Sequence, residues 1–105
     1  MAKKALDTLT ESMFYILMAF LDGEKCGTEV TGFVNSVTEG RVVIGPATLY
    51  TVIAKFEKEK LVEEINVEGR KRTYRLTTKG EETFDREYER LLKCVEDVKK
   101  LGVEP

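Results

Sequence analysis

The stretch GPATLYTVIAKFEK, residues 45–58, decides the fold. A glycine–proline step opens it, and proline suits the first position of a helix because it lacks an N–H group that would have no partner there. Helical spacing relates four of its apolar residues, which predicts a helix with one buried stripe: Leu49, Val52, Ile53 and Phe56. The opposite side carries residues of types that can contact base edges and phosphates: Thr48, Thr51, Lys55 and Lys58.

A β-hairpin is predicted directly after this helix. Residues 61–67 and 72–77 are rich in β-branched and aromatic side chains, and Glu68-Gly69-Arg70 between them supplies a glycine-containing turn. Five basic residues and no acidic residue lie between positions 70 and 79: Arg70, Lys71, Arg72, Arg75 and Lys79. We therefore expect a hairpin with a basic tip and a basic return strand.

A first helix is predicted to start near Thr8, where Thr8 and Glu11 fit the Thr-x-x-Glu capping box, and to end at Gly23. Because apolar residues cover most of its surface, we expect this helix to be buried on nearly all sides. Its apolar run, residues 13–21, is too short for a bilayer, which needs about 20 residues. No small-residue cleavage site follows this run, so we expect neither a signal peptide nor a membrane partner.

A second helix is predicted from about Thr28 to Thr38, again from apolar residues at helical spacing. Gly32 lies inside it, and we attribute this glycine to close packing against a neighbouring helix. Residues 41–44 are predicted to form a short extended piece before the third helix.

A last helix is predicted from Thr77 or Thr78, with Thr78 and Glu81 as a second capping box. Its apolar residues step by 4, 3, 4 and 3, which is a heptad seam: Phe84, Tyr88, Leu91, Val95 and Val98. The core of so small a domain is too small to bury this seam as well. We therefore expect it to pair with a second copy of the chain, with packing inside one subunit as the alternative.

These elements predict a mostly α fold with a small β-hairpin wing: a winged helix-turn-helix plus one long C-terminal dimerisation helix. We assign residues 1–78 to the DNA-binding domain with its N-terminal helix, and residues 79–105 to the dimerisation helix. In such a fold the third helix enters the major groove and the hairpin, or wing, lies along the DNA backbone. The predicted contacts to double-stranded DNA are Pro46, Thr48, Tyr50, Thr51, Lys55, Arg70, Lys71 and Arg72.

The same residues resemble the PadR-like family of transcriptional regulators. Residues 45–50 and 55–62 are similar to the family's glycine–proline step, Leu-Tyr pair and Glu-rich helix end, and residues 70–77 with Lys79-Gly80 resemble its wing and the exit into the last helix. The resemblance implies a homodimeric repressor whose first and last helices pack across the dimer. It also implies a small-molecule effector of unknown identity, since members bind drugs between the subunits or respond to phenolic acids.

Several side chains have a second interpretation. Tyr50 could be a half-buried core tyrosine as well as a phosphate contact, and the basic run could be a solvated hairpin face. Four aromatic residues could line an effector pocket, although aromatic residues at helical spacing are more often core: Phe14, Tyr15, Phe84 and Tyr88. Residues 26–29 depart from the His-Gly-Tyr-Glu-like stretch common in the family, and the chain has no tryptophan.

Composition narrows the classes of function. The 105 residues suit one domain, and 42% apolar with 34% charged residues is typical of a globular protein. There is no histidine, so we expect no enzyme, no cofactor and no metal site built on cysteine and histidine. The net charge of −2 keeps open a protein-interaction module without DNA binding. Cys26 and Cys94 are expected to be ordinary thiols in the reduced cytoplasm, with a redox switch as a third alternative.

Overall fold

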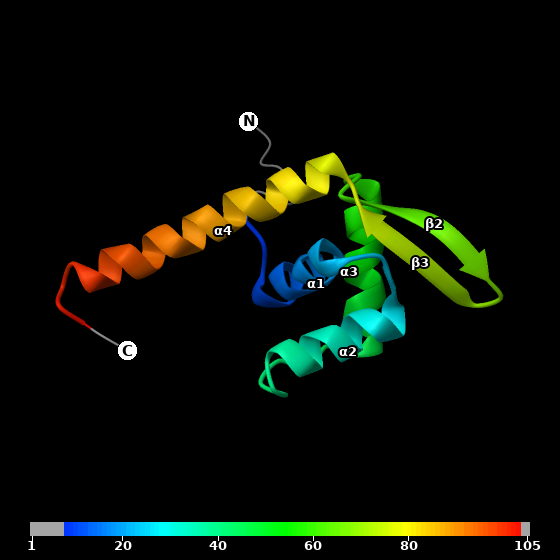
Figure 1. Cartoon of the computed structure of the whole chain (residues 1–105), viewed down its shortest axis with the longest axis horizontal. Helices are drawn as coiled ribbons and strands as arrows, with labels where there is room; N and C mark the ends of the chain where they lie inside the picture. Colours follow the sequence, from blue (N-terminus) through cyan, green and yellow to red (C-terminus); the bar gives the residue numbers. More distant parts are fainter. Residues whose placement is uncertain (1–7, 104–105) are drawn as a thin grey trace.

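The computed structural model describes residues 8–103 (Figure 1). In this range the chain forms α1 (Glu11–Asp22), β1 (Lys25–Cys26), α2 (Gly27–Val37), α3 (Pro46–Lys58), β2 (Val62–Glu68), β3 (Lys71–Leu76) and α4 (Thr78–Lys99). The predicted mostly α fold with a hairpin wing and a long last helix is confirmed. The outer ends of the two predicted domains, residues 1–7 and 104–105, lie outside the described range.

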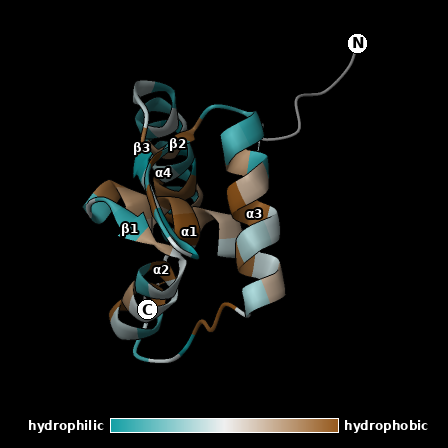
Figure 2. Cartoon of the chain, turned by 90° about the vertical axis from the view of Figure 1, so that its right-hand side faces the viewer, coloured by the Kyte–Doolittle hydropathy of each residue, from teal (hydrophilic) through white to brown (hydrophobic). Residues whose placement is uncertain are grey.

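Helix α1 forms the centre of the core (Figure 2). It contacts α2, α3, α4 and β3, and the side chains of Ile16, Leu17 and Ala19 are fully buried. Burial on so many sides is what the apolar surface of this helix predicted. Within the described residues, no helix is long and apolar enough to cross a membrane.

Both predicted capping residues were wrong by one or two positions. The cap of α1 is Thr10, whose Oγ1 accepts the N–H of Met13 at 3.2 Å. The cap of α4 is Thr77, whose Oγ1 accepts the N–H of Gly80 at 3.0 Å. Each site offers two threonines close together, and only one of them caps the helix. Thr77 is selected because its N–H and its hydroxyl also donate to the carbonyl of Leu61, at the junction of α3 and β2.

The predicted short strand at residues 41–44 was also wrong, and the strand that does form lies before α2. Among the described residues, 41–44 have no strand pairing. The hydroxyl of Thr38 instead accepts the N–H of Val42 at 3.1 Å and donates to the carbonyl of Val34 at 2.7 Å. This bonding satisfies the backbone locally, while β1 pairs antiparallel with β3.

Two glycines show opposite packing. Gly32 is exposed, and a Cβ placed there would meet no atom within 4 Å, so the predicted close helix packing at this residue was wrong. A Cβ on Gly80 would collide with the carbonyl oxygen of Leu61. The close approach of backbones that requires a glycine is therefore in the first turn of α4, where this helix docks against the end of α3.

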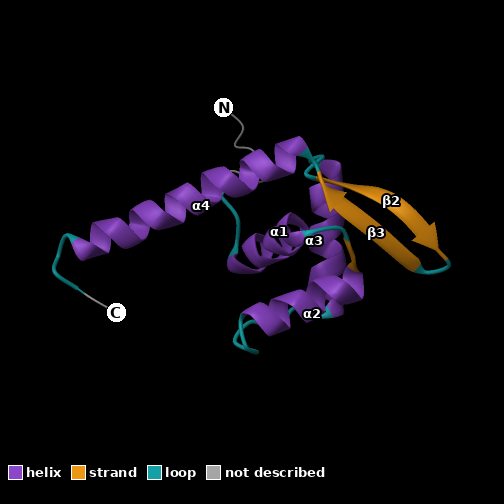
Figure 3. Cartoon of the chain, in the orientation of Figure 1, coloured by secondary structure: helices purple, strands orange, loops and turns teal. Residues whose placement is uncertain are grey.

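The wing is the antiparallel pair β2–β3, which projects away from the helices (Figure 3). Its register runs from Val62 opposite Leu76 to Glu68 opposite Lys71, with one irregularity between Glu64 and Asn66. The predicted hairpin is thus confirmed. Strand β3 lies in the middle of the sheet, between β1 and β2, so the wing is joined to the chain that leads into α2.

Candidate nucleic-acid interface

Helix α3 presents one buried and one exposed face, as predicted. Its apolar stripe is buried in the core: Leu49, Val52, Ile53 and Phe56. The five residues predicted to contact DNA from this helix are all exposed: Pro46, Thr48, Tyr50, Thr51 and Lys55. The burial of the stripe fixes which side of α3 faces outward, and the small polar and basic side chains are therefore available to a partner.

Tyr50 is 57% exposed, so it lies beside the buried stripe of α3 and its hydroxyl is accessible. Its ring lies against the first residue of α2, because a Cβ on Gly27 would come within 3.0 Å of the Tyr50 hydroxyl oxygen and 3.3 Å of Leu49. Gly27 therefore makes room for Tyr50 at the N-terminus of α2. This contact links α3 to α2 on the side that faces the wing.

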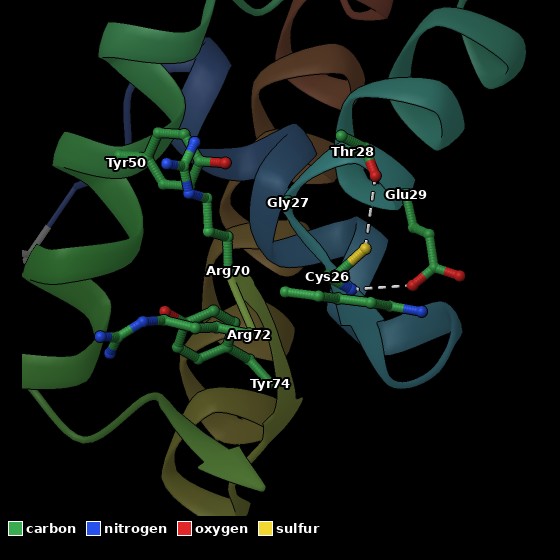
Figure 4. Close-up of a pocket in the computed structure, with 9 residues that line it drawn as sticks. Cys26, Gly27, Thr28, Glu29, Tyr50, Arg70, Arg72 and Tyr74 are labelled. Carbon is green, nitrogen blue, oxygen red and sulfur yellow. Dashed lines mark hydrogen bonds between the residues drawn. The ribbon is translucent and has the colours of Figure 1, made fainter. Parts of the chain in front are cut away.

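A groove of about 550 Å³ lies between α3, the start of α2 and the wing (Figure 4). It is lined by Cys26, Gly27, Thr28, Glu29, Tyr50, Arg70, Lys71, Arg72 and Tyr74. Four of the eight predicted contact residues thus meet around one groove, and the other four lie elsewhere on α3. The sequence analysis missed the contribution of residues 26–29 and of Tyr74. Pairing of Cys26 with Thr73 brings these segments together, and a two-residue strand leaves no periodic pattern to predict it.

The N-terminus of α2 already carries a carboxylate of its own. Glu29 accepts the backbone N–H of Cys26 at 2.8 Å, which is the return half of a capping box. This hydrogen bond, a second one with the Cys26 side chain and the nearby charges of Lys71 and Lys25 lower the pKa of Glu29 below its usual value. One acidic group therefore faces the cations of the groove.

The wing is less basic than its return strand suggested. Arg72 Nη1 is 2.9 Å from Glu64 Oε1, and Arg75 Nε is 2.7 Å from Glu63 Oε2. Both carboxylates belong to β2, whereas the basic wing was predicted from residues 70–79 alone. Arg70 and Lys71 form no ion pair within 4.0 Å with any described residue. The unneutralised charge is therefore concentrated at the tip.

The heptad seam of α4 divides into a covered part and an uncovered part. Phe84 is 8% exposed and stacks on Phe14 of α1, with ring centroids 5.0 Å apart. Every residue from position 88 to position 103 is exposed, although four of them belong to the seam: Tyr88, Leu91, Val95 and Val98. Phe84 thus completes the core of the single chain, and the other four side chains are available to a partner.

The covered part of α4 ends at a buried carboxylate. Glu87 is 4% exposed and accepts two hydrogen bonds from Arg90, from Nε at 3.0 Å and from Nη2 at 2.6 Å. The Arg90 guanidinium is the main cause that lowers the pKa of Glu87, against an opposing effect of burial. The carboxylate is therefore charged at neutral pH.

The two cysteines differ in environment. Cys26 is buried at the start of α2, with its Sγ 3.4 Å from Thr28 Oγ1, and Cys94 is exposed on α4. No group of three potential metal ligands occurs within residues 8–103.

The sequence profile of the transcriptional regulator PadR-like family matches residues 16–86. The chain belongs to this family. The resemblance seen in the sequence is thereby confirmed, and the match places the chain in a family of transcriptional regulators and not of enzymes.

Solved structures share the fold of this chain. A transcriptional regulator from Clostridium thermocellum has a TM-score of 0.74 and 26% identity, covering 84% of this chain and 89% of that one. A PadR-like transcription factor from Bacteroides fragilis has a TM-score of 0.72 and 18% identity, covering 86% and 88%. PadR from Bacillus subtilis in complex with operator DNA has a TM-score of 0.64 and 18% identity, covering 73% and 46%.

A curated relative comes from a transposon of Streptomyces fradiae. It is an uncharacterized 37.1 kDa protein that is 31% identical to this chain over 77 residues, or 73% of this chain. The match spans 22% of that relative's own length. The similarity therefore covers one domain of a much larger protein.

Proposed function

We propose that this PadR-like regulator binds double-stranded DNA sequence-specifically, as a homodimer, and represses transcription from a pseudo-palindromic operator. The observation that carries the proposal is the groove in which Tyr50 of α3 meets Arg70 and Lys71 of the wing. An exposed polar helix face next to a cationic hairpin tip is the combination that a winged helix uses on DNA. We propose that the protein acts on DNA in the cytoplasm.

The two elements have different roles in this proposal. Thr48, Thr51 and Lys55 of α3 read base edges in the major groove, because hydroxyl and ammonium groups can form hydrogen bonds there. Arg70 and Lys71 bind phosphates, together with the Tyr50 hydroxyl, and so fix the orientation of the protein. The similar fold of a regulator held on operator DNA supports this arrangement.

The uncovered part of α4 supports the homodimer. An isolated helix of about 12 residues is marginal in water, and every residue from 88 to 99 is exposed in the single chain. A second copy of the seam would bury Leu91, Val95 and Val98. We therefore assign residues 1–78 to DNA binding and residues 79–105 to dimerisation, which would place two copies of α3 roughly 34 Å apart along the DNA.

The seam also supports a response to a small-molecule effector. The rings of Phe14, Phe84 and Tyr88 form a parallel stack, with successive centroids 5.0 and 6.3 Å apart. This stack ends at Tyr88, which is 50% exposed, so a flat apolar ligand could extend it between two copies. Such a ligand would change the spacing of the two α3 helices only to the extent that it prefers one dimer arrangement over the other.

The experiment that tests the proposal is selection from a randomised duplex library by the purified protein at two salt concentrations, followed by sequencing. We expect a palindrome with half-sites about one helical turn apart, and affinity that falls steeply with salt. Fusion of the enriched site to a promoter and reporter gene then tests repression. Enrichment without a palindrome would contradict the symmetric dimer, and absence of DNA binding at low salt would remove the proposal.

A second candidate function is a protein-interaction module without DNA binding. It is favoured by the net charge of −2 and by the two wing arginines that already pair with carboxylates, Arg72 and Arg75. Binding to a protein partner through a largely apolar surface should depend little on salt, whereas DNA binding releases counterions. The salt series therefore separates the two candidates.

A further inference from the structure

Glu64 lies on the groove side of the wing, next to Arg72, one of the residues predicted from the sequence to contact DNA. It stands opposite Tyr74 in the register of β2 and β3, and alternate residues of β3 point to the same face. Arg72 and Tyr74 therefore share that face, and both line the groove. Figure 4 shows the Arg72 side chain extended toward α3, and its Nη1 donates to Glu64 Oε1 at 2.9 Å.

The charge of Glu64 acts within the groove. Burial raises the pKa of Tyr74 above its usual value, and the carboxylates of Glu57 and Glu64 raise it further. Glu57 and Glu64 thus add negative charge beside Tyr74, and Arg72, which lines the groove, offsets it.

We infer that Glu64 sets the affinity of the wing for DNA by competing with phosphate for the guanidinium of Arg72. The inference rests on the DNA binding proposed above. Carboxylate and phosphate oxygens accept the same guanidinium hydrogen bonds, so while the pair is formed Glu64 occupies the Nη1 donor of Arg72 and offsets its positive charge. The Arg72 side chain is 62% exposed, and exposed ion pairs are weak. The exchange is therefore accessible, and it lowers affinity for every sequence alike.

The hairpin contains its own control for this inference. Glu63, the neighbouring residue, forms the equivalent ion pair with Arg75 at 2.7 Å. Neither Glu63 nor Arg75 lines the groove. Replacing either glutamate by glutamine removes one negative charge from β2 and keeps the size of the side chain, so the two variants differ only in which arginine is released.

The test is a fluorescence-anisotropy titration of a mixed-sequence duplex with the wild-type chain, Glu64→Gln and Glu63→Gln, at several salt concentrations. We expect Glu64→Gln to lower Kd by about 3- to 10-fold and to steepen the salt dependence by about one phosphate contact. Glu63→Gln should lower Kd by less than about twofold, through long-range charge alone. In an Arg72→Ala background, Glu64→Gln should add no more than Glu63→Gln, because the competition is gone. Thermal unfolding of each variant checks that it is folded.

The possible outcomes test the role of Glu64 and the proposed DNA binding separately. Equal gains from Glu64→Gln and Glu63→Gln, or a gain from Glu64→Gln that persists without Arg72, would overturn the role of Glu64 and leave DNA binding in place. Absence of binding by every variant at low salt would remove the proposed function, and this inference with it.

Discussion

Helices α3 and α4 are both amphipathic, yet their exposed faces differ in chemistry. The outer face of α3 carries threonine and lysine side chains next to Tyr50. The outer face of the second half of α4 carries Leu91, Val95 and Val98, which are between 36% and 52% exposed. Water solvates the first face well, whereas an apolar stripe of the second kind normally marks a protein contact.

The difference indicates that the two helices await different partners. The apolar stripe of α3 is buried within its own chain, so the polar face of this helix is available to a polar partner. In α4, burial in the core extends only as far as Glu87. Substitutions on each helix therefore distinguish a face for DNA from a face for a second copy.

The largest effect is expected from charges placed in the α4 seam. The double variant Leu91→Asp/Val95→Asp removes two apolar side chains per copy, each contributing about 1.5–3 kcal/mol when buried. We expect the dimer Kd to rise by about three orders of magnitude or more, measured by analytical ultracentrifugation. Lys93→Asp, on the opposite side of the helix, is the control and should leave the dimer intact. A dimer that survives the double variant would contradict the assignment of the seam.

A smaller effect on stability is expected at the end of the covered part of α4. Glu87→Gln should lower the free energy of unfolding at pH 7 by about 1–3 kcal/mol, because charge-assisted hydrogen bonds to Arg90 are lost. Since the folded-state pKa of Glu87 is lowered, its contribution is present above the unfolded-state pKa and disappears as the pH falls through the folded-state pKa. Urea titrations at several pH values measure this.

The pH series has an internal control. Asp97→Asn breaks an ion pair with Lys100, 3.3 Å long, in which both side chains are largely exposed, so it should change stability little. The difference between wild type and Glu87→Gln should shrink from pH 7 to acid. A difference that stays constant with pH would exclude the carboxylate charge as its cause.

A change of sequence preference is expected from the outer face of α3. Thr51→Ala removes a hydroxyl that we propose to read a base edge, so discrimination at one base pair of each half-site should weaken by about 1 kcal/mol. Library selection with the variant measures this directly. Thr31→Ala, which removes a hydroxyl from α2 and leaves the outer face of α3 unchanged, is the control. An unchanged consensus would place base reading elsewhere on α3.

A uniform loss of affinity is expected from the tip of the wing. Arg70→Ala should weaken binding to operator and random DNA equally, by about fivefold, and should lower the salt slope by about one. Arg75→Ala serves as the comparison, because Glu63 already neutralises that side chain and its loss should matter less. A selective loss on the operator would show that Arg70 reads sequence, contrary to its proposed role.

The smallest effect is expected at Gly32, away from both faces. Its position in α2 is exposed and open, so Gly32→Ala should raise the free energy of unfolding by about 0.5–1 kcal/mol through helix propensity alone. Dimerisation and DNA affinity should stay unchanged. A destabilised variant in thermal unfolding would reveal a contact to Gly32 from a second copy.

Local patterns predicted the helices and the hairpin well. The stripe of α3 and the apolar surface of α1 are properties of consecutive residues, and burial followed them closely. The predictions failed where several local choices were equally good. Thr8 and Thr10, or Thr77 and Thr78, can each cap a helix, and in the second pair the contact with the distant Leu61 selects Thr77.

The candidate interface was predicted only in part, and for the same reason. The sequence pointed to Tyr50 and Arg70, but it gave no sign that Arg72 would pair with Glu64. That pairing depends on the register of β2 against β3, which shifts between Glu64 and Asn66. Cross-strand neighbours follow from register and cannot be deduced from the charge of one strand.

The sequence by itself determined the helical order, the hairpin and the family, because periodicity and turn residues act over a few neighbouring positions. The tertiary structure alone decided which of these surfaces remain open. It buried Phe84 against Phe14 and left Val95 uncovered. It also neutralised Arg72 and left Arg70 unpaired among the described residues. Burial and ion pairing depend on which elements meet in space, and only the packed chain settles that.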